Sequence, residues 1–489
     1  MLSPVSGFAL GLFVWTLPSA CASASAAGDS ERAGAEAANE TLYLRAERVI
    51  VQPGEVLENV ALIVRDGRIV AIGKDLHKPD GARELEAKVI CAAFIDVWGA
   101  LGLATNELFD ATASAGTRAA DAYDPYVDEP LRTETLRAGV TCVRVQTGTS
   151  SRVGGVGALV RVAPGLTRAS AIVVDEAGVG MSVGLSANVQ GQGATFEIVD
   201  GQLVQRESTA RGMDPFDRQA DVDRVVAAVE SGRGYLQSKV EHKHELEDWQ
   251  KKITEKEAEL EKDFKKAKKD REKEEKDAKE KNKKFEEKKY KEDKRPQPPK
   301  FDEDAEVLGR VADGEMPLVV QAHRTAELRA ILGGVEKYDR LRLVLEGASE
   351  AMSCVAQLGA RHVPVIVTPA LVGRGAPDEL EGSDLSLAAR LSNAGVPVLI
   401  GSGGTSAAAS RDLPLLAEVA IGNGLDREKA FEALTIGAAR AFDASDRIGS
   451  VMRGRDAELL LLDGEPLTPQ GRVLYVISAG RVVVSPEGQ

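Results

Sequence analysis

Short apolar segments alternate with helix-like segments through most of this chain. Residues 301–444 show the pattern most clearly, because apolar runs of strand length are separated there by amphipathic stretches. Such alternation is typical of a parallel β-sheet covered by helices. The predicted strands of this region are 317–322, 341–345, 364–367 and 396–400. With 489 residues, the chain is long enough for an α/β barrel and at least one further unit.

Strand-like segments also stand at both ends of the chain. Residues 42–96 consist of apolar runs and turns, and Asp66-Gly67 between two alternating runs is a strong hairpin signal. Residues 445–489 contain further short β segments. We therefore expect a composite β-sandwich from 42–96 and 445–489, beside an α/β unit of the (β/α)8 TIM-type barrel class from 97–240 and 301–444.

Residues 241–300 interrupt this pattern with a charged run. They contain 22 Lys and Arg against 19 Asp and Glu, and their Lys, Glu and Ala content favours a helix. Apolar residues recur at heptad spacing for about three repeats, as in a coiled coil. These residues are Leu246, Trp249, Ile253, Leu260 and Ala267. The segment is predicted to be a long charged helical insert, either a solvated spacer or a coiled coil that binds a partner.

The chain outside this insert is acidic. The formal charge of the whole chain is −14, and because the insert carries a small positive excess, the remainder carries −17. A negatively charged body repels phosphate backbones. We therefore expect no nucleic-acid partner.

The first residues indicate export. Residues 1–26 contain an apolar stretch too short to span a bilayer, followed by small residues that offer A-x-A cleavage frames, as in a signal peptide. The stretch has no preceding Lys or Arg, so a cytoplasmic N-terminus is one alternative, and a lipoprotein anchored at Cys21 is another. We expect an exported protein of the periplasm or cell envelope, with no transmembrane helix.

Several longer motifs carry a family resemblance. They are NVALIVRDGRIVAIG, AAFIDV, LRAGVTCVRVQTG, VGGVGALVRV, PLVVQAHRTAEL, AGVPVLIGSGG, ALTIGAARAF and DRIGSVMRGRDAELLLLDGEPL. Together they resemble the amidohydrolase superfamily, specifically its imidazolonepropionase-like branch, from about Leu42 to Val484 without the insert. The resemblance implies a (β/α)8 barrel with a composite β-sandwich from both termini, which agrees with the pattern of segments.

The resemblance also implies hydrolysis of C–N bonds by one or two divalent metals at the C-terminal mouth of the barrel, where coordination lowers the pKa of water. The family's H-x-H pair after the first barrel strand corresponds to Trp98 and Ala100. The histidines of the fifth and sixth strands correspond to Gln321 and Gly347, and the aspartate of the eighth strand corresponds to Gly403. None of these side chains is a usual metal ligand.

Histidine is too rare for a shifted alignment to restore such a site. The chain has five histidines, and only His323 and His362 lie in the predicted barrel. No lysine occurs from 89 to 238, which excludes a bridging carboxylated lysine in that interval. An all-carboxylate site with Asp96 or Glu346 is conceivable, but such sites suit Mg or Ca better than hydrolytic Zn.

A few other polar residues are predicted near the same rim. His323 follows a predicted barrel strand, where it is either part of the site or a helix-start histidine that caps the helix or pairs with Glu327. Ser402 has no base nearby in the sequence, although a triad is defined by spatial geometry. The candidate pocket rim consists of Asp96, His323, Glu346 and Ser402.

These observations predict an exported amidohydrolase-like protein that is catalytically degenerate and serves as a binding or assembly subunit without a cofactor. Its expected partner is an active amidohydrolase relative or another protein, bound through the 241–300 helix in a hetero-oligomer. One alternative is a metal-dependent hydrolase of cyclic amides or dipeptides, with zinc or another divalent metal in a remodelled site. The other is a scaffold that acts through the charged helix. We also expect Trp98 to fill the space that metals and the substrate carbonyl occupy in relatives.

Overall fold

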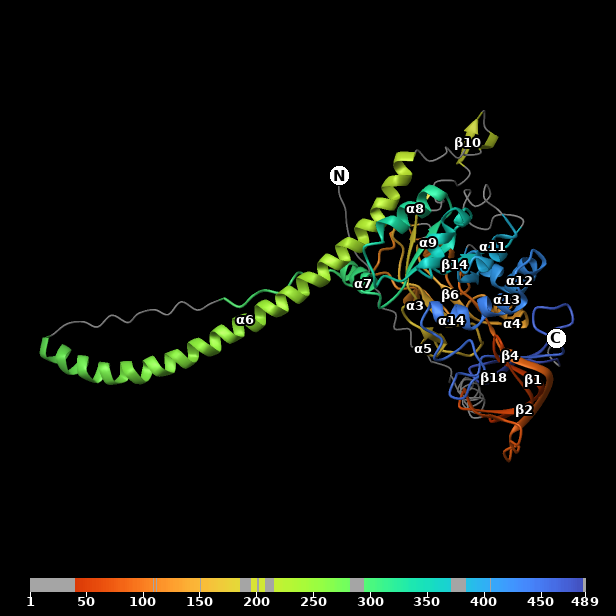
Figure 1. Ribbon diagram of the computed structural model, residues 1–489, viewed down its shortest axis with the longest axis horizontal. Coiled ribbons are helices and arrows are strands. Elements are labelled where there is room, and N and C mark those ends of the chain that lie inside the picture. The colour runs from red at the N-terminus through yellow and green to blue at the C-terminus, as the bar shows by residue number, and fades with distance from the viewer. Residues whose placement is uncertain are drawn as a thin grey trace, which may run out of the picture.

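The computed structural model describes residues 40–486, apart from 109, 111, 150, 185–194, 200–201, 207–214, 282–293, 371–383 and 405. The predicted signal peptide therefore lies outside the described residues. Figure 1 shows an α/β body, a β-sheet at one end of it, and one long helix that leaves the body. None of the described helices combines the length and the apolar character that a membrane-spanning helix needs.

The strands at the two ends of the chain form one sheet. Seven strands pair in the order β18-β17-β16-β4-β1-β2-β3, and β16 joins β4 with Leu460 opposite Cys91. The strands are β1 Leu42–Gln52, β2 Glu55–Arg65, β3 Arg68–Gly73, β4 Arg83–Ala92, β16 Leu459–Leu462, β17 Val473–Ser478 and β18 Arg481–Val484. The predicted hairpin turn is present, because Asp66 and Gly67 have φ values of 50° and 78°, as a two-residue I′ turn requires.

The described strands of both terminal segments pair in one continuous sheet, and the sandwich form of this unit stays a prediction. Alternate residues such as Leu42, Leu44, Leu62, Leu459 and Leu461 share one buried cluster that the sheet itself supplies. The period-two alternation of side chains therefore gives the sheet its own apolar side.

The α/β body contains two sheets. One has the order β5-β6-β7-β8 and the other has the order β15-β14-β13-β12-β9. Their strands are β5 Phe94–Asp96, β6 Val140–Val145, β7 Ala158–Arg161, β8 Ile172–Val174, β9 Val179–Ser182, β12 Leu318–Ala322, β13 Leu343–Gly347, β14 Val365–Val367 and β15 Val398–Ile400. A separate hairpin is formed by β10 Thr195–Val199 and β11 Gln202–Arg206.

The second sheet is parallel, as the alternation predicts, whereas β7 pairs antiparallel with both β6 and β8. No described helix lies between β6 and β7, and a direct connection of that kind favours antiparallel pairing. Backbone hydrogen bonds join the two sheets near β7 and β9. In one of them, Gly154 N–H donates to the Gly180 carbonyl at 2.8 Å. In the described part of the chain, no ladder joins β5 to β15, so a closed barrel is not seen.

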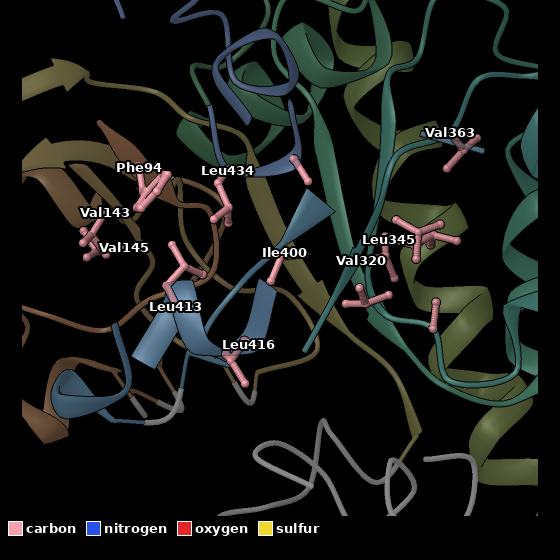
Figure 2. Close-up of a cluster of buried hydrophobic side chains, with 14 of the residues drawn as sticks. Phe94, Val143, Val145, Val320, Leu345, Val363, Ile400, Leu413, Leu416 and Leu434 are labelled. Atoms are coloured by element: carbon pink, nitrogen blue, oxygen red, sulfur yellow. The ribbon is translucent and has the colours of Figure 1, made fainter. Parts of the chain in front are cut away.

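Helices surround these sheets. They are α2 Thr105–Leu108, α3 Ala119–Ala122, α4 Glu129–Arg137, α5 Arg168–Ala171, α7 Glu303–Ala312, α8 Thr325–Gly334, α9 Val355–Ala360, α11 Leu387–Asn393, α12 Leu413–Gly422, α13 Arg427–Leu434 and α14 Ile436–Ala441, with the 3-10 helices η2 Ala351–Cys354 and η3 Ala407–Asp412. Val320 and Leu345 of the strands share a buried cluster with Leu413 and Leu416 of α12 (Figure 2). Every second strand residue therefore faces the helices.

The longest helix is α6, Pro215–Lys281, with 67 residues and a length of about 100 Å at 1.5 Å per residue. It begins well before the predicted insert at 241–300, so the charged segment continues a helix that starts in the body. Val222, Val225 and Val229 are buried in the body. Farther along, the helix leaves the body, as Figure 1 shows.

Candidate functional site

Polar side chains gather where the strands of the α/β body end. Val319 of β12, Val344 of β13 and Leu399 of β15 belong to an inner cluster, distinct from the cluster that faces the helices. Because side chains alternate along a strand, Gln321 and Glu346 lie on the same inner side as Val319 and Val344, nearer the C-terminal strand ends. The inner side is therefore apolar at its middle and polar at the end where barrel enzymes carry their sites.

Asp96 ends β5 and is completely buried. Its Oδ1 accepts hydrogen bonds from Trp98 N–H at 3.1 Å and Ser402 N–H at 3.0 Å. Its Oδ2 accepts from the hydroxyls of Ser402 at 2.6 Å and Ser410 at 2.7 Å. A carboxylate offers about four acceptor positions, so this one is fully used. Asp96 thus connects β5 to the segment after β15 and to η3, across the side where no ladder joins the two sheets.

Trp98 follows β5 and is only 4% exposed. Its side chain belongs to the inner cluster, and its indole lies against Gly404, where an added Cβ would be 2.5 Å from Nε1. Gly401 leaves room for Trp98 Cβ in the same way. Ala100 is also buried, but it belongs to the cluster that faces the helices. The two residues at the predicted H-x-H positions are therefore part of two different clusters.

Glu346 forms an ion pair with Arg144 of β6, with 3.1 Å between Oε1 and Nη1. Both side chains are buried, and the Arg144 guanidinium also donates to the Ala177 carbonyl at 2.7 Å and lies over the Phe442 ring at 4.8 Å. Burial raises the pKa of Glu346 to about 7, although Arg144 opposes that rise. Burial likewise lowers the pKa of Arg144, which stays charged because guanidinium groups start far above neutrality.

Gln321 and Gly347 occupy neighbouring strand ends without acting as ligands. Gln321 Oε1 accepts from the Ser182 hydroxyl at 3.3 Å, and that hydroxyl also donates to the Thr149 carbonyl at 2.7 Å. Gly347 has φ of 79°, and a Cβ there would lie 2.2 Å from Cε1 of His323. A side chain at that position would therefore displace the imidazole.

His323 is buried just beyond β12, and its ring Nδ1 lies 2.9 Å from the Ser349 hydroxyl. Its link to Glu327 runs through the backbone, since the His323 and Arg324 amides donate to Glu327 Oε2 at 3.4 and 3.2 Å. Arg218 of α6 donates to the other Glu327 oxygen at 2.7 Å. The expected pairing of His323 with Glu327 is therefore a helix-start contact and leaves the imidazole to Ser349.

Gly403 lies in the buried turn after β15 with φ of 101°. Side chains are strained at that φ value, so an aspartate in this position would need a different backbone conformation. Ser402, next to it, is fully buried and engaged with Asp96 and with the Trp98 carbonyl at 3.1 Å. The strand ends thus hold Asp96, Ser402 and Trp98 in one cluster, and Arg144 with Glu346 in another.

These residues do not fit the divalent metal that the family resemblance implies. A metal needs several free His, Cys, Asp or Glu ligands. Asp96 already accepts four hydrogen bonds, and Glu346 is paired with Arg144. Within the residues that the structure describes, no group of three or more such side chains lies where it could hold a metal ion.

Several residues of this region carry no clear sequence signal. Arg144 is detectable only as one charged residue in the otherwise apolar strand VTCVRV. Gln146 follows it, and Gly180 makes room for its amide, since an added Cβ would lie 1.3 Å from Gln146 Nε2. A glycine within a strand can mark such a close approach. The local sequence around Ser349 and Ser410 does not distinguish them from the other serines of the chain.

Comparison with known proteins supports the same fold. The amidohydrolase family profile matches residues 348–483. An amidohydrolase structure from Thermotoga maritima MSB8 is similar with a TM-score of 0.64 and 20% identity, over 91% of this chain and 100% of the other. An ochratoxinase structure from A. niger is similar with a TM-score of 0.49 and 14% identity, over 92% and 96% of the two chains. The search among curated proteins gives no sequence match. Residues 348–483 therefore match the amidohydrolase family, and the fold of the chain is similar to that of the Thermotoga maritima amidohydrolase.

Proposed function

We propose that this protein is an exported amidohydrolase-like subunit of the imidazolonepropionase-like branch that has lost metal-dependent hydrolysis and acts in binding or assembly. The observation that carries the proposal is the engagement of both carboxylates at the strand ends. Asp96 accepts four internal hydrogen bonds, and Glu346 is paired with the buried Arg144. Trp98 supports it further, because an indole occupies a position at which the family resemblance implies a histidine.

Metal content tests this proposal directly. The purified full chain, dialysed without chelator, is analysed by inductively coupled plasma mass spectrometry beside an active amidohydrolase prepared in parallel. We expect well below one transition metal per chain, and no zinc-dependent hydrolysis of cyclic amides or dipeptides. Stoichiometric zinc that survives dialysis, or turnover that depends on added zinc, would refute the loss of metal-dependent catalysis.

One observation favours a second candidate, a hydrolase with a remodelled site. Burial raises the pKa of Glu346 to about 7, and a buried carboxyl that titrates near neutrality is suited to general base catalysis. The ion pair with Arg144 competes with that role, because it fixes the carboxylate inside the fold. Hydrolysis of a dipeptide or cyclic amide that Glu346→Gln abolishes would favour this candidate over the binding subunit.

We assign the assembly role to the projecting part of α6. The first part of this helix is fixed to the body, since Gly232 and Gly309 allow α6 and α7 to approach closely and Lys239 pairs with Glu306 at 2.7 Å. Beyond Val240, which is 55% exposed, the helix extends away from the body (Figure 1). A long charged helix of this kind offers a large surface to a partner or to a second copy.

The Lys239–Glu306 contact also shows how to remove this element. Because it brings α6 and α7 together, residues 241–300 can be replaced by a short Gly-Ser linker without separating the two helices. We expect the shortened chain to stay folded by circular dichroism and to lose partner capture or self-association in cross-linking and light scattering. A shortened chain that assembles like the full chain would refute the role of α6.

A pair of substitutions within the helix gives a sharper comparison. Leu246→Ser with Ile253→Ser removes two positions of the predicted apolar seam, and both are partly covered in the structure. Glu245→Ser with Lys252→Ser is the matched control, because both of these residues are exposed. The seam variant is expected to weaken assembly and the control to leave it unchanged. Equal effects would refute the seam as the contact surface.

Export is tested separately. N-terminal sequencing of the protein recovered from a periplasmic or cell-envelope fraction should begin shortly after the small residues near position 26. Recovery of the intact N-terminus from the cytoplasm would refute export and would leave the assembly proposal unaffected.

A further inference from the structure

A cavity of about 570 Å³ opens at the opposite end of the strands from Asp96 and Glu346. It is bounded by the residues at which β12, β13, β14 and β15 begin, including Pro317, Leu343, Pro364 and Val398, and by α13 and α14. Its volume lies within the usual range for small-molecule sites, roughly 300–1,000 Å³. The inner cluster separates it from the candidate site at the polar strand ends.

The charged residues of this cavity are mostly basic. Arg342, Arg361, Lys429 and Arg440 line it, and Glu432 is the single acidic residue among its lining residues. This excess is unusual for the chain, because the residues outside 241–300 carry a formal charge of −17. Local positive charge within an acidic body indicates a specific site rather than general attraction of anions.

The available carboxylates do not balance these cations. Glu432 is shared, since it lies 2.9 Å from Lys429 Nζ and 3.4 Å from Arg440 Nη1. Arg342 pairs with Asp443 at 2.8 Å. Arg361 donates to the carbonyls of Leu332 and Val335 at 3.4 and 3.5 Å, and in the described part of the chain it has no carboxylate partner. Among the described residues, the four lining cations thus form direct ion pairs with only two carboxylates, Glu432 and Asp443, which leaves an excess of two positive charges within this group.

Apolar residues from both faces of the sheet line part of the cavity. Leu343, Val344, Val363 and Leu399 line it, and all four are buried side chains. The basic side chains at the rim stay accessible, since Lys429 is 59% and Arg440 is 57% exposed. A ligand with an apolar body and an anionic head group would match both surfaces.

We propose that this cavity binds a small organic phosphate whose apolar body lies against the apolar lining residues and whose phosphate is held by Arg361, Arg440 and Lys429. A phosphate group fits because it carries up to two negative charges, equal to the excess in the cavity, and because guanidinium groups bind its oxygens with paired hydrogen bonds. A carboxylate head group would leave one positive charge uncompensated. This inference is independent of the proposed loss of catalysis.

Binding of phenyl phosphate to the full chain tests the proposal by isothermal titration calorimetry. We expect saturable one-site binding that weakens as salt is added, with weaker binding of inorganic phosphate, benzoate and phenol, because each lacks part of the match. Arg361→Gln and Arg440→Gln should each weaken phenyl phosphate binding about tenfold, since each removes a charge-assisted contact. Arg45→Gln is the matched control, because it removes an exposed arginine paired with Glu86 in the terminal sheet.

Circular dichroism of each variant shows whether it is folded. Arg440→Gln alters an exposed side chain, so it provides the test if Arg361→Gln disturbs α8. Absence of saturable binding at millimolar phenyl phosphate would overturn the proposal. So would equal affinities for phenyl phosphate and phenol, or unchanged affinity in a folded Arg440→Gln variant.

Discussion

Removal of the Asp96 carboxylate should destabilise the α/β body strongly. In the structure this group is a buried acceptor for two backbone amides and two hydroxyls, and it connects β5 to the turn after β15. If Asp96 were an unused remnant of a metal site, its removal would relieve a buried charge and would leave stability unchanged or increased. The perturbation Asp96→Ala therefore separates a structural role from a vestigial one.

The expected magnitude follows from the hydrogen bonds that are lost. In Asp96→Ala, the amides of Trp98 and Ser402 and the hydroxyl of Ser410 lose their acceptor, whereas the Ser402 hydroxyl keeps the Trp98 carbonyl at 3.1 Å. Each buried donor without an acceptor costs about 1–3 kcal/mol, so the free energy of unfolding should fall by about 3–6 kcal/mol after partial relaxation. That loss is a large share of the stability of a typical folded protein.

Urea unfolding, followed by circular dichroism and tryptophan fluorescence, measures this effect. Asp384→Ala is the matched control, because Asp384 also accepts three hydrogen bonds, from Ser386 N–H, the Ser386 hydroxyl and Arg390. Its side chain is 33% exposed, so water can replace the carboxylate and the cost should stay below about 1 kcal/mol. If Asp96→Ala does not fold, Asp96→Asn keeps one acceptor oxygen and should cost about 1–2 kcal/mol. Equal stability of the Asp96 and Asp384 variants would refute the reasoning.

Three further predictions concern the same region. Glu346 has a folded-state pKa of about 7, above its unfolded value, so its stabilising contribution is complete at low pH and is lost as the pH rises toward 7. Between pH 5 and 8, the free energy of unfolding of the wild type should fall by about 2–3 kcal/mol more than that of Glu346→Gln, as measured by urea unfolding at each pH. Equal pH dependence of the two proteins would contradict the raised pKa. Gly404→Ala should lower the free energy of unfolding by about 1–3 kcal/mol more than Gly454→Ala, as measured by thermal or urea unfolding. Both glycines have positive φ, but only the methyl group added at Gly404 would meet Trp98. Equal losses of stability would contradict this contact. Trp98→His with Ala100→His should give no zinc-dependent hydrolysis of cyclic amides or dipeptides. Gly403, to which the resemblance assigns the eighth-strand aspartate, still has no carboxylate, and Asp96 is fully hydrogen bonded. Zinc-dependent turnover would show that the ligand positions are assigned wrongly.

Local patterns predicted most of the secondary structure. The Asp66-Gly67 turn is recognisable because two positive φ values at that dipeptide fit few alternatives. The strand predicted at 317–322 is β12, Leu318–Ala322, because a fully buried strand reads as an apolar run. The parallel order of β12 to β15 likewise follows from the helices between the strands. The antiparallel pairing of β7 was missed, since it depends on which neighbour a strand meets in space.

The sequence by itself also determined how few metal ligands are available. Histidine and lysine counts depend on composition alone, so the scarcity of these ligand types could be read without coordinates. The assignment of the family's ligand positions to Trp98, Ala100, Gln321, Gly347 and Gly403 comes from the resemblance and stays a prediction. Only the tertiary structure decided which groups the side chains of this region contact. Asp96 meets Ser402 and Ser410 across more than 300 residues of chain, and Arg144 meets Glu346 across 202. The basic cavity likewise combines the starts of four strands with α13 and α14. Such contacts depend on long-range packing, which no local periodicity encodes.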